Sequence, residues 1–169
     1  MRTSLTSETL RAMFAAETGY YPILLLTISH PNLATPLRIS SDATQRLAVS
    51  DTDIVYGTSS RGLDFVFLPL SLNLPVDSEQ EAPRTTISMD NIDRSMVPII
   101  RSLTSPPTLT IELVMSCSVG VVEATFPDFE LTGIKYDALT ISGTLALDMF
   151  VTEPFPAGSF TPSQFPGIF

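Results

Sequence analysis

Apolar and polar residues alternate with a period of two in several separate segments of this chain. In residues 65–74, FVFLPLSLNL, every second position from Val66 onward is Val or Leu. The same alternation recurs in residues 109–116 and 139–149. Successive side chains of a β-strand point to opposite faces of its sheet, so this pattern predicts strands with one buried face. The chain is therefore expected to be mainly β.

Other stretches add strands of a different kind. Residues 20–30, YYPILLLTISH, form a continuous apolar run that is typical of a strand buried on both faces. Pro69 cannot donate a ladder hydrogen bond, so the strand that contains it is expected at a sheet edge or with a bulge. Residues 136–140 predict a turn near Asp137. Further strands are expected at residues 37–40 and 85–89, and one or two more within residues 119–132.

A helix is expected near the start of the chain. Residues 5–17 carry Leu10, Met13 and Phe14 at helical spacing among several alanines, and Gly19 is expected to end the helix. The pattern predicts an amphipathic helix.

A second, shorter helix is expected within residues 90–103. Pro98 would kink it, or it would mark the first turn of a helix that begins near Val97. Seven or eight strands with two helices indicate a β-sandwich or an incomplete barrel. We expect one β-rich domain over residues 1–152, followed by a Pro- and Phe-rich arm at residues 153–169.

Composition narrows the class of protein. The net charge is −9 and the nine Lys and Arg are scattered, whereas adhesion to nucleic acid needs clustered cations at the phosphates. Charged residues make up only 16% of the chain, so much of the surface is neutral, which suits a subunit that buries area against neighbours. The sequence predicts neither a membrane span nor a signal peptide, so synthesis is expected in the cytoplasm.

The two residue types most often used in catalysis occur once each. His30 is the only histidine, so a catalytic triad or a metal site would have to be built around this one imidazole. We interpret it as a structural side chain with satisfied hydrogen bonds. Cys117 is the only cysteine and lies in a strand-like run, which favours a buried structural thiol over a nucleophile.

The residues that could bind metals or phosphates lack the spacing of known binding loops. Asp42, Asp51 and Asp53 offer oxygen ligands for Ca²⁺ but lack the spacing of a calcium loop, so we interpret them as solvated loop charges. No metal or cofactor is expected. Residues 57–62, GTSSRG, lack the lysine and the spacing of a phosphate-binding loop. They are interpreted as a turn, with Arg61 paired to a carboxylate of this chain or of a neighbour.

Several short stretches together resemble one protein family. These are SHPNL, YGTSSRG, RSLTSPP, KYDALTISGTL, EPFPA and FPGIF, in this order. The chain is similar over nearly its whole length to small tail proteins of tailed bacteriophages and prophages, a family known as the domain of unknown function DUF1833. Members of that family are minor tail or tail-tip components, and the resemblance implies no established enzymatic residues.

The resemblance implies a structural subunit of a bacteriophage tail with a β-sandwich or split barrel of the tail-tube type. It implies a closed ring, with a hexamer expected, between the tail tube and the baseplate hub. The tube, hub and tape measure proteins would be its neighbours in the virion. An acidic protein suits a channel through which DNA passes without specific binding. No enzymatic activity is expected.

Two other functions stay open at this point. A tail-assembly chaperone would be absent from the finished virion. A tail-associated cell-wall hydrolase would need paired carboxylates, for which Glu112, Glu123 and Glu130 are the candidates.

The arm at residues 153–169, EPFPAGSFTPSQFPGIF, is the candidate subunit interface. Its four prolines keep the backbone extended and remove hydrogen-bond donors. Its apolar side chains would cover either the open face of their own domain or an adjacent subunit or the hub. The candidate interface residues are Phe155, Phe160, Phe165, Ile168 and Phe169, together with Arg61.

Overall fold

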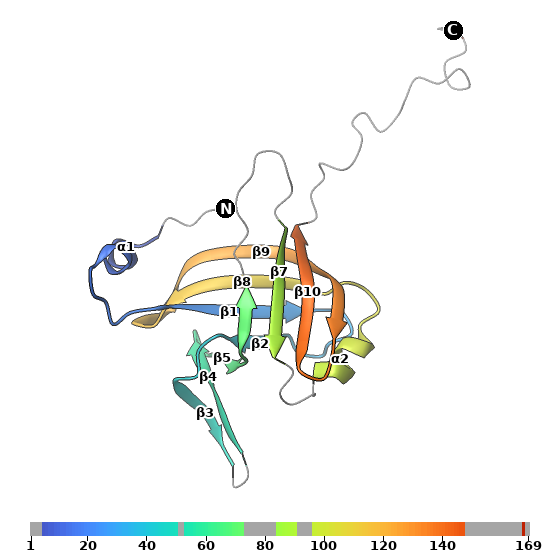
Figure 1. Cartoon of the computed structure of the whole chain (residues 1–169), viewed down its shortest axis with the longest axis horizontal. Helices are drawn as coiled ribbons and strands as arrows, with labels where there is room; N and C mark the ends of the chain where they lie inside the picture. Colours follow the sequence, from blue (N-terminus) through green and yellow to red (C-terminus); the bar gives the residue numbers. More distant parts are fainter. Residues whose placement is uncertain (1–4, 51–52, 73–83, 91–95, 148–166, 168–169) are drawn as a thin grey trace.

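The computed structural model describes residues 5–50, 53–72, 84–90, 96–147 and 167. In these residues the fold is mainly β: one ten-stranded sheet curls into a split barrel and is accompanied by two short helices (Figure 1). The predicted fold class, including one N-terminal and one internal helix, is confirmed.

The described residues form two helices and ten strands. The helices are α1 (Ser7–Phe14) and α2 (Met96–Ser102). The first five strands are β1 (Pro22–Ser29), β2 (Leu37–Ser40), β3 (Gln45–Val49), β4 (Ile54–Ser60) and β5 (Leu63–Phe67). The others are β6 (Leu70–Leu72), β7 (Arg84–Asp90), β8 (Thr108–Met115), β9 (Ser118–Tyr136) and β10 (Thr140–Leu147).

The strand order in the sheet is β3-β4-β5-β2-β1-β8-β9-β10-β7-β6. Neighbouring strands are antiparallel except β2 and β5, which are parallel. Strands β3 and β6 are the two edges of the described sheet. Antiparallel neighbours fit the short connections of this chain, because such strands can be joined by tight turns.

The sheet carries apolar clusters on both faces. β1 contributes to both, because its residues alternate between a larger cluster with Leu26 and a smaller one with Ile23 and Leu25. The expectation of a strand buried on both faces within residues 20–30 is therefore confirmed for β1, whereas Tyr20 and Tyr21 before it are exposed. The larger cluster contains Leu26, Ile28, Ile39, Ile87, Met89, Leu109, Ile111, Phe129, Leu131, Ile141 and Leu145. The smaller cluster contains Ile23, Leu25, Phe65 and Val114.

Two strands lie where the sequence predicts the acidic loop charges and the turn of residues 57–62. β3 and β4 pair with each other and occupy most of this region. The turn predicted at residues 57–62 is too long, because only Arg61 and Gly62 reverse the direction of the chain. Both have positive φ, 53° and 76°, which matches a two-residue hairpin turn whose twist fits the flanking strands.

The alternating segment at residues 65–74 forms two strands instead of one. β5 ends before Pro69, and β6 follows it as a sheet edge, as expected for a proline that cannot donate to a ladder. The break also changes the buried face. Phe65 is buried and Val66 is exposed in β5, whereas Leu70 packs against the larger cluster.

Both helices are shorter than the longest predicted versions. α1 ends at Phe14 because Ala15 already has an extended backbone, with φ −70° and ψ 141°. α2 begins at Met96, so Pro98 lies in its first turn, where a missing N–H leaves no intrahelical bond unmade. The alternative of a short helix beginning near Val97 is therefore confirmed.

The predicted turn near Asp137 is present between β9 and β10. The Oδ1 of Asp137 accepts hydrogen bonds from the backbone N–H groups of Leu139 and Thr140, both at 2.7 Å. These hydrogen bonds lower the pKa of Asp137. Leu139 was expected to share the buried face of Ile141, but it is exposed, because it lies in the turn and not in the strand.

Candidate functional site

Arg61 fixes the β4–β5 turn onto the body of the sheet. Its Nη1 and Nη2 donate to Oε1 and Oε2 of Glu112 on β8, at 3.0 and 2.5 Å, in a bidentate pair. The hydrogen bond with Glu112 raises the pKa of Arg61. Beside it, the Ser60 hydroxyl donates to the Val119 carbonyl on β9 at 2.5 Å. The expected pairing of Arg61 with a carboxylate is confirmed within this chain, and its role at a subunit interface stays a prediction.

Glu123 is a fully buried carboxylate that binds the start of α1. It lies where the β8–β9 register shifts between Leu113 and Val114. Its Oε2 accepts from the Thr6 backbone N–H and its Oε1 from the Thr6 hydroxyl, both at 2.8 Å. Thr6 is the N-cap of α1, and its side chain accepts from the Thr9 N–H at 3.3 Å.

The hydrogen bonds with α1 shift the pKa of Glu123. Burial alone would raise it by disfavouring the charged form, but hydrogen bonds from Thr6 and Thr9 outweigh burial, and the pKa is lowered. A negative charge at this point also complements the positive end of the helix dipole. Glu123 thus acts as a polar anchor that holds α1 against β9.

The apolar side chains of α1 face outward. Within this helix, which the structure describes in full, only Thr9 is buried. Leu10, Met13 and Phe14 are 41%, 64% and 86% exposed, and we call these three residues the α1 stripe. Figure 1 shows α1 at one end of the molecule, beyond the β8–β9 turn. The helix is therefore oriented by polar contacts, with its apolar side free.

The outer part of the β3–β4 hairpin carries a second group of exposed apolar side chains. Val49 pairs with Ile54, and Tyr56 lies two residues further along β4, so all three share one face. They are 67%, 45% and 37% exposed, and we call them the hairpin patch. No residue of β3 is buried, and the hairpin projects from the body of the sheet (Figure 1).

An open groove of about 690 Å³ separates α1 from the β8–β9 turn. Its lining includes Ala12, Tyr20, Met115 and Cys117. Cys117 is exposed, so the prediction of a buried structural thiol is wrong. The strand-like run is broken there, because Ser116 and Cys117 form the turn between β8 and β9.

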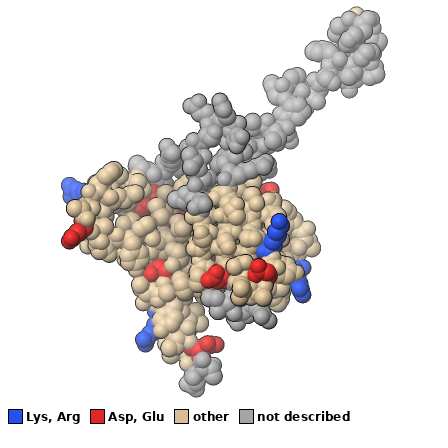
Figure 2. Space-filling view, viewed as in Figure 1, with Lys and Arg blue, Asp and Glu red and all other residues tan. Residues whose placement is uncertain are grey.

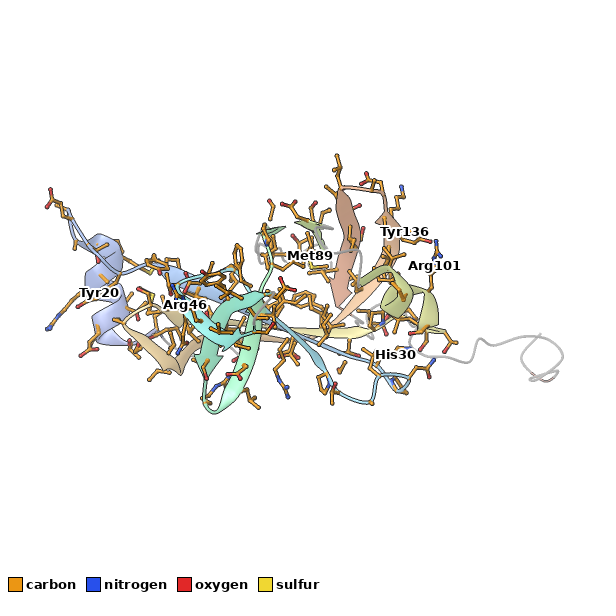
Figure 3. All side chains as sticks on the ribbon, turned by 90° about the horizontal axis from the view of Figure 1, so that it is seen from below. Tyr20, His30, Arg46, Met89, Arg101 and Tyr136 are labelled. Carbon is orange, nitrogen blue, oxygen red and sulfur yellow. The ribbon has the colours of Figure 1, made fainter. Side chains whose placement is uncertain are left out.

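His30 is the structural side chain that was expected. Its Nδ1 accepts from the Asn32 N–H at 3.0 Å, so Nε2 carries the proton and donates to the Ser105 hydroxyl at 2.8 Å. The imidazole is buried and ties the loop after β1 to the loop after α2 (Figure 3). Both ring nitrogens are thus used in holding two loops together.

The predicted acidic cluster does not converge on a metal site among the described residues. Asp42 accepts hydrogen bonds from the hydroxyls of Tyr21 and Thr44, at 3.2 and 2.6 Å, and Asp53 is exposed. Asp51 lies outside the described residues. In the part of the chain that the structure places, no group of three or more His, Cys, Asp or Glu could hold a metal ion.

The carboxylates named for a hydrolase have different settings. Glu112 is paired with Arg61, and Glu123 binds the start of α1. Glu130 is exposed on β9. Two of the three are therefore engaged in contacts that hold elements together.

The apolar residues predicted for the C-terminal arm lie outside the described residues. These are Phe155, Phe160, Phe165, Ile168 and Phe169. Residues 73–83 and 91–95 lie outside the described residues as well. Among the described residues, the α1 stripe and the hairpin patch are two groups of exposed apolar side chains that the structure offers for contacts.

The family model of DUF1833, a domain of unknown function, matches residues 9–160. The chain belongs to this family. The match begins in α1, spans every described strand and ends inside the predicted arm. No curated protein matches the sequence. Among the described residues of this DUF1833 protein, no helix is long and apolar enough to cross a membrane.

Proposed function

We propose that this DUF1833 protein is a structural subunit of a bacteriophage tail. It assembles with copies of itself into a closed ring between the tail tube and the baseplate hub, and the ring surrounds the DNA channel. The observation that carries the proposal is the family match over residues 9–160, because the tail-tip role was inferred from resemblance to that family.

The surface of the fold supports a role in assembly. Figure 2 shows a face on which Lys, Arg, Asp and Glu are few and scattered among neutral residues. The α1 stripe and the hairpin patch expose six large apolar or aromatic side chains on one helix and two strands. Contiguous exposed apolar surface is uncommon on monomeric proteins and marks sites of contact with other molecules.

The charge of the chain supports a place beside DNA without adhesion. Binding to duplex DNA releases counterions when Lys and Arg replace them at the phosphates. The net charge of −9 opposes that exchange. A ring of such subunits would present an acidic or neutral channel, which lets DNA slide past.

The proposal is tested on intact particles. Mass spectrometry of purified virions is expected to detect the protein in a fixed ratio to the tail tube protein, and cryo-electron microscopy is expected to place it in a rotationally symmetric ring. A protein that is abundant in infected cells but absent from particles would be an assembly chaperone instead. Peptidoglycan lysis by the purified protein, lost in Glu130→Gln, would indicate a hydrolase.

A further inference from the structure

Helix α1 is amphipathic, and its apolar side faces away from its own domain. Such a helix is ordinarily docked through its apolar side, since burial of that side supplies most of its stability. Here the buried carboxylate of Glu123 instead holds the N-terminus of the helix through Thr6. The orientation of the α1 stripe is therefore fixed before any partner arrives.

The hairpin patch is also apolar and exposed. Val49, Ile54 and Tyr56 form an apolar face on the two-stranded outer part of the hairpin, and a ribbon of only two strands is marginally stable in water by itself. A helix laid across this face would bury both surfaces. Nothing in the described residues of the same chain covers either one.

We propose that the α1 stripe of one copy packs against the hairpin patch of a second copy. The contact rests on the proposed function, because it would join neighbouring subunits of the ring. The two surfaces are unlike each other, so the contact is heterologous: each copy offers its helix to one neighbour and its hairpin to the other. Repeated contacts of this kind close into rings when the rotation between copies permits it.

The exposed area suits the centre of an interface between copies. A stable interface buries about 800 Å² on each partner. Phe14 alone can contribute on the order of 150–200 Å². The three side chains of the α1 stripe together offer roughly 400 Å² of exposed area, about half of what one partner of a stable interface buries. The surrounding polar residues would supply the rest as the rim.

One pair of exposed charges beside the two surfaces is opposite in sign. Arg46 pairs with Tyr56 across β3 and β4 and therefore shares the face of the hairpin patch. Glu17 follows the α1 stripe three residues after Phe14, and both Arg46 and Glu17 are exposed. Opposite charges at the rim favour this pairing of unlike surfaces over contacts of helix with helix or hairpin with hairpin.

The experiment uses two substitutions in the full chain, Phe14→Asp and Val49→Asp, and sedimentation velocity over a range of concentrations. The unaltered protein is expected to form species larger than a dimer. Each variant is expected to associate about 100-fold more weakly, because a carboxylate would be buried without a partner. A one-to-one mixture of the two variants should form dimers and stop there, since one intact helix meets one intact hairpin patch.

Other results would overturn the proposal. The proposal is wrong if the unaltered protein stays monomeric over the whole range of concentrations. It is also wrong if the one-to-one mixture of the two variants stays monomeric. Full association of Val49→Asp with loss in Phe14→Asp would indicate contact between two helices instead. Leu139→Asp is the matched control, because Leu139 is 77% exposed in the β9–β10 turn and belongs to neither surface. It should leave association unchanged.

A second pair of variants avoids burying a charge. Glu17→Arg and Arg46→Glu are each expected to weaken association about tenfold, and the double variant is expected to recover it. Failure of the double variant to recover would contradict the packing. Incorporation into virions separates this contact from the function: if both aspartate variants enter particles normally, the contact is wrong and the tail role stands, whereas absence of the unaltered protein from particles overturns the role.

Discussion

Removal of the Glu123 carboxylate tests whether a polar anchor holds α1 in place. We consider Glu123→Gln, which keeps the side-chain volume but loses the charge and one of the two acceptor oxygens. Glu123 accepts two hydrogen bonds from Thr6, each at 2.8 Å. Hydrogen bonds to a charged group contribute about 1.5–3 kcal/mol each, and the amide retains one of them in weaker form. The expected loss in the free energy of α1 docking is about 2–4 kcal/mol.

Because no apolar side chain of α1 is buried, this loss should undock the helix without unfolding the sheet. The measurement is amide hydrogen exchange followed by mass spectrometry. Peptides that cover Ser7–Phe14 are expected to lose protection by a factor of about 30 to 700, as follows from 1.4 kcal/mol per tenfold change. Peptides from β1 and β8 should exchange as in the unaltered protein. Glu130→Gln is the control, since Glu130 lies exposed on the same strand.

The same anchor predicts a dependence on pH. The folded-state pKa of Glu123 is lowered, so its stabilising effect is fully present above the ordinary pKa of about 4.5 and is lost as the pH falls through the folded-state value. Protection of α1 should therefore decline at acidic pH. Glu8 and Arg11 are the other charged residues on this helix. In Glu123→Gln this part of the decline should be absent. Unchanged α1 protection in the variant at neutral pH, or equal loss across the whole sheet, would refute the reasoning.

Three further substitutions test other parts of the structure. Arg61→Ala is expected to destabilise the fold by about 1 kcal/mol in urea titrations, because the Arg61 side chain is more than one third exposed and solvent screens its pair with Glu112; a loss above 3 kcal/mol would show that the pair was underestimated. Phe65→Ala, at the centre of the smaller cluster, should cost about 3–5 kcal/mol in the same titrations, and a cost below 1 kcal/mol would contradict its burial. Cys117 should react with a thiol reagent in the folded protein at a rate close to that of the urea-unfolded chain, whereas a strongly slowed reaction would mean that the β8–β9 turn is covered.

The sequence predicted those strands whose burial gives a regular pattern. β8 and β10 alternate because one face meets the larger cluster, and β1 is apolar throughout because both faces are covered. β3 is exposed on both faces, so its residues carry no alternation and the strand could not be recognised. Cys117 was misjudged for a related reason: a two-residue turn without Gly or Pro leaves no mark in an apolar run.

The polar contacts were less predictable than the strands. Arg61 could be assigned a carboxylate partner because it lies in a turn between two strands, but the choice of Glu112 depends on how far the sheet curls. Glu123 was considered only as a catalytic candidate. Its partner Thr6 lies 117 positions earlier in the chain, and no local pattern connects them. Long-range pairs of this kind follow from the closed fold and not from spacing.

Helix α1 shows why an apolar pattern and a domain's own core need not coincide. The spacing of Leu10, Met13 and Phe14 predicts an amphipathic helix, and the helix is present, yet its apolar side is exposed. If the stripe serves a contact between copies, the two substitutions on α1 must behave differently. Phe14→Asp should weaken association about 100-fold and leave the exchange protection of α1 intact in the monomer. Glu123→Gln should reduce both, because an undocked helix no longer holds its stripe in a fixed orientation. Loss of association without loss of helix protection in Glu123→Gln would separate the anchor from the contact and leave the outward stripe without this explanation.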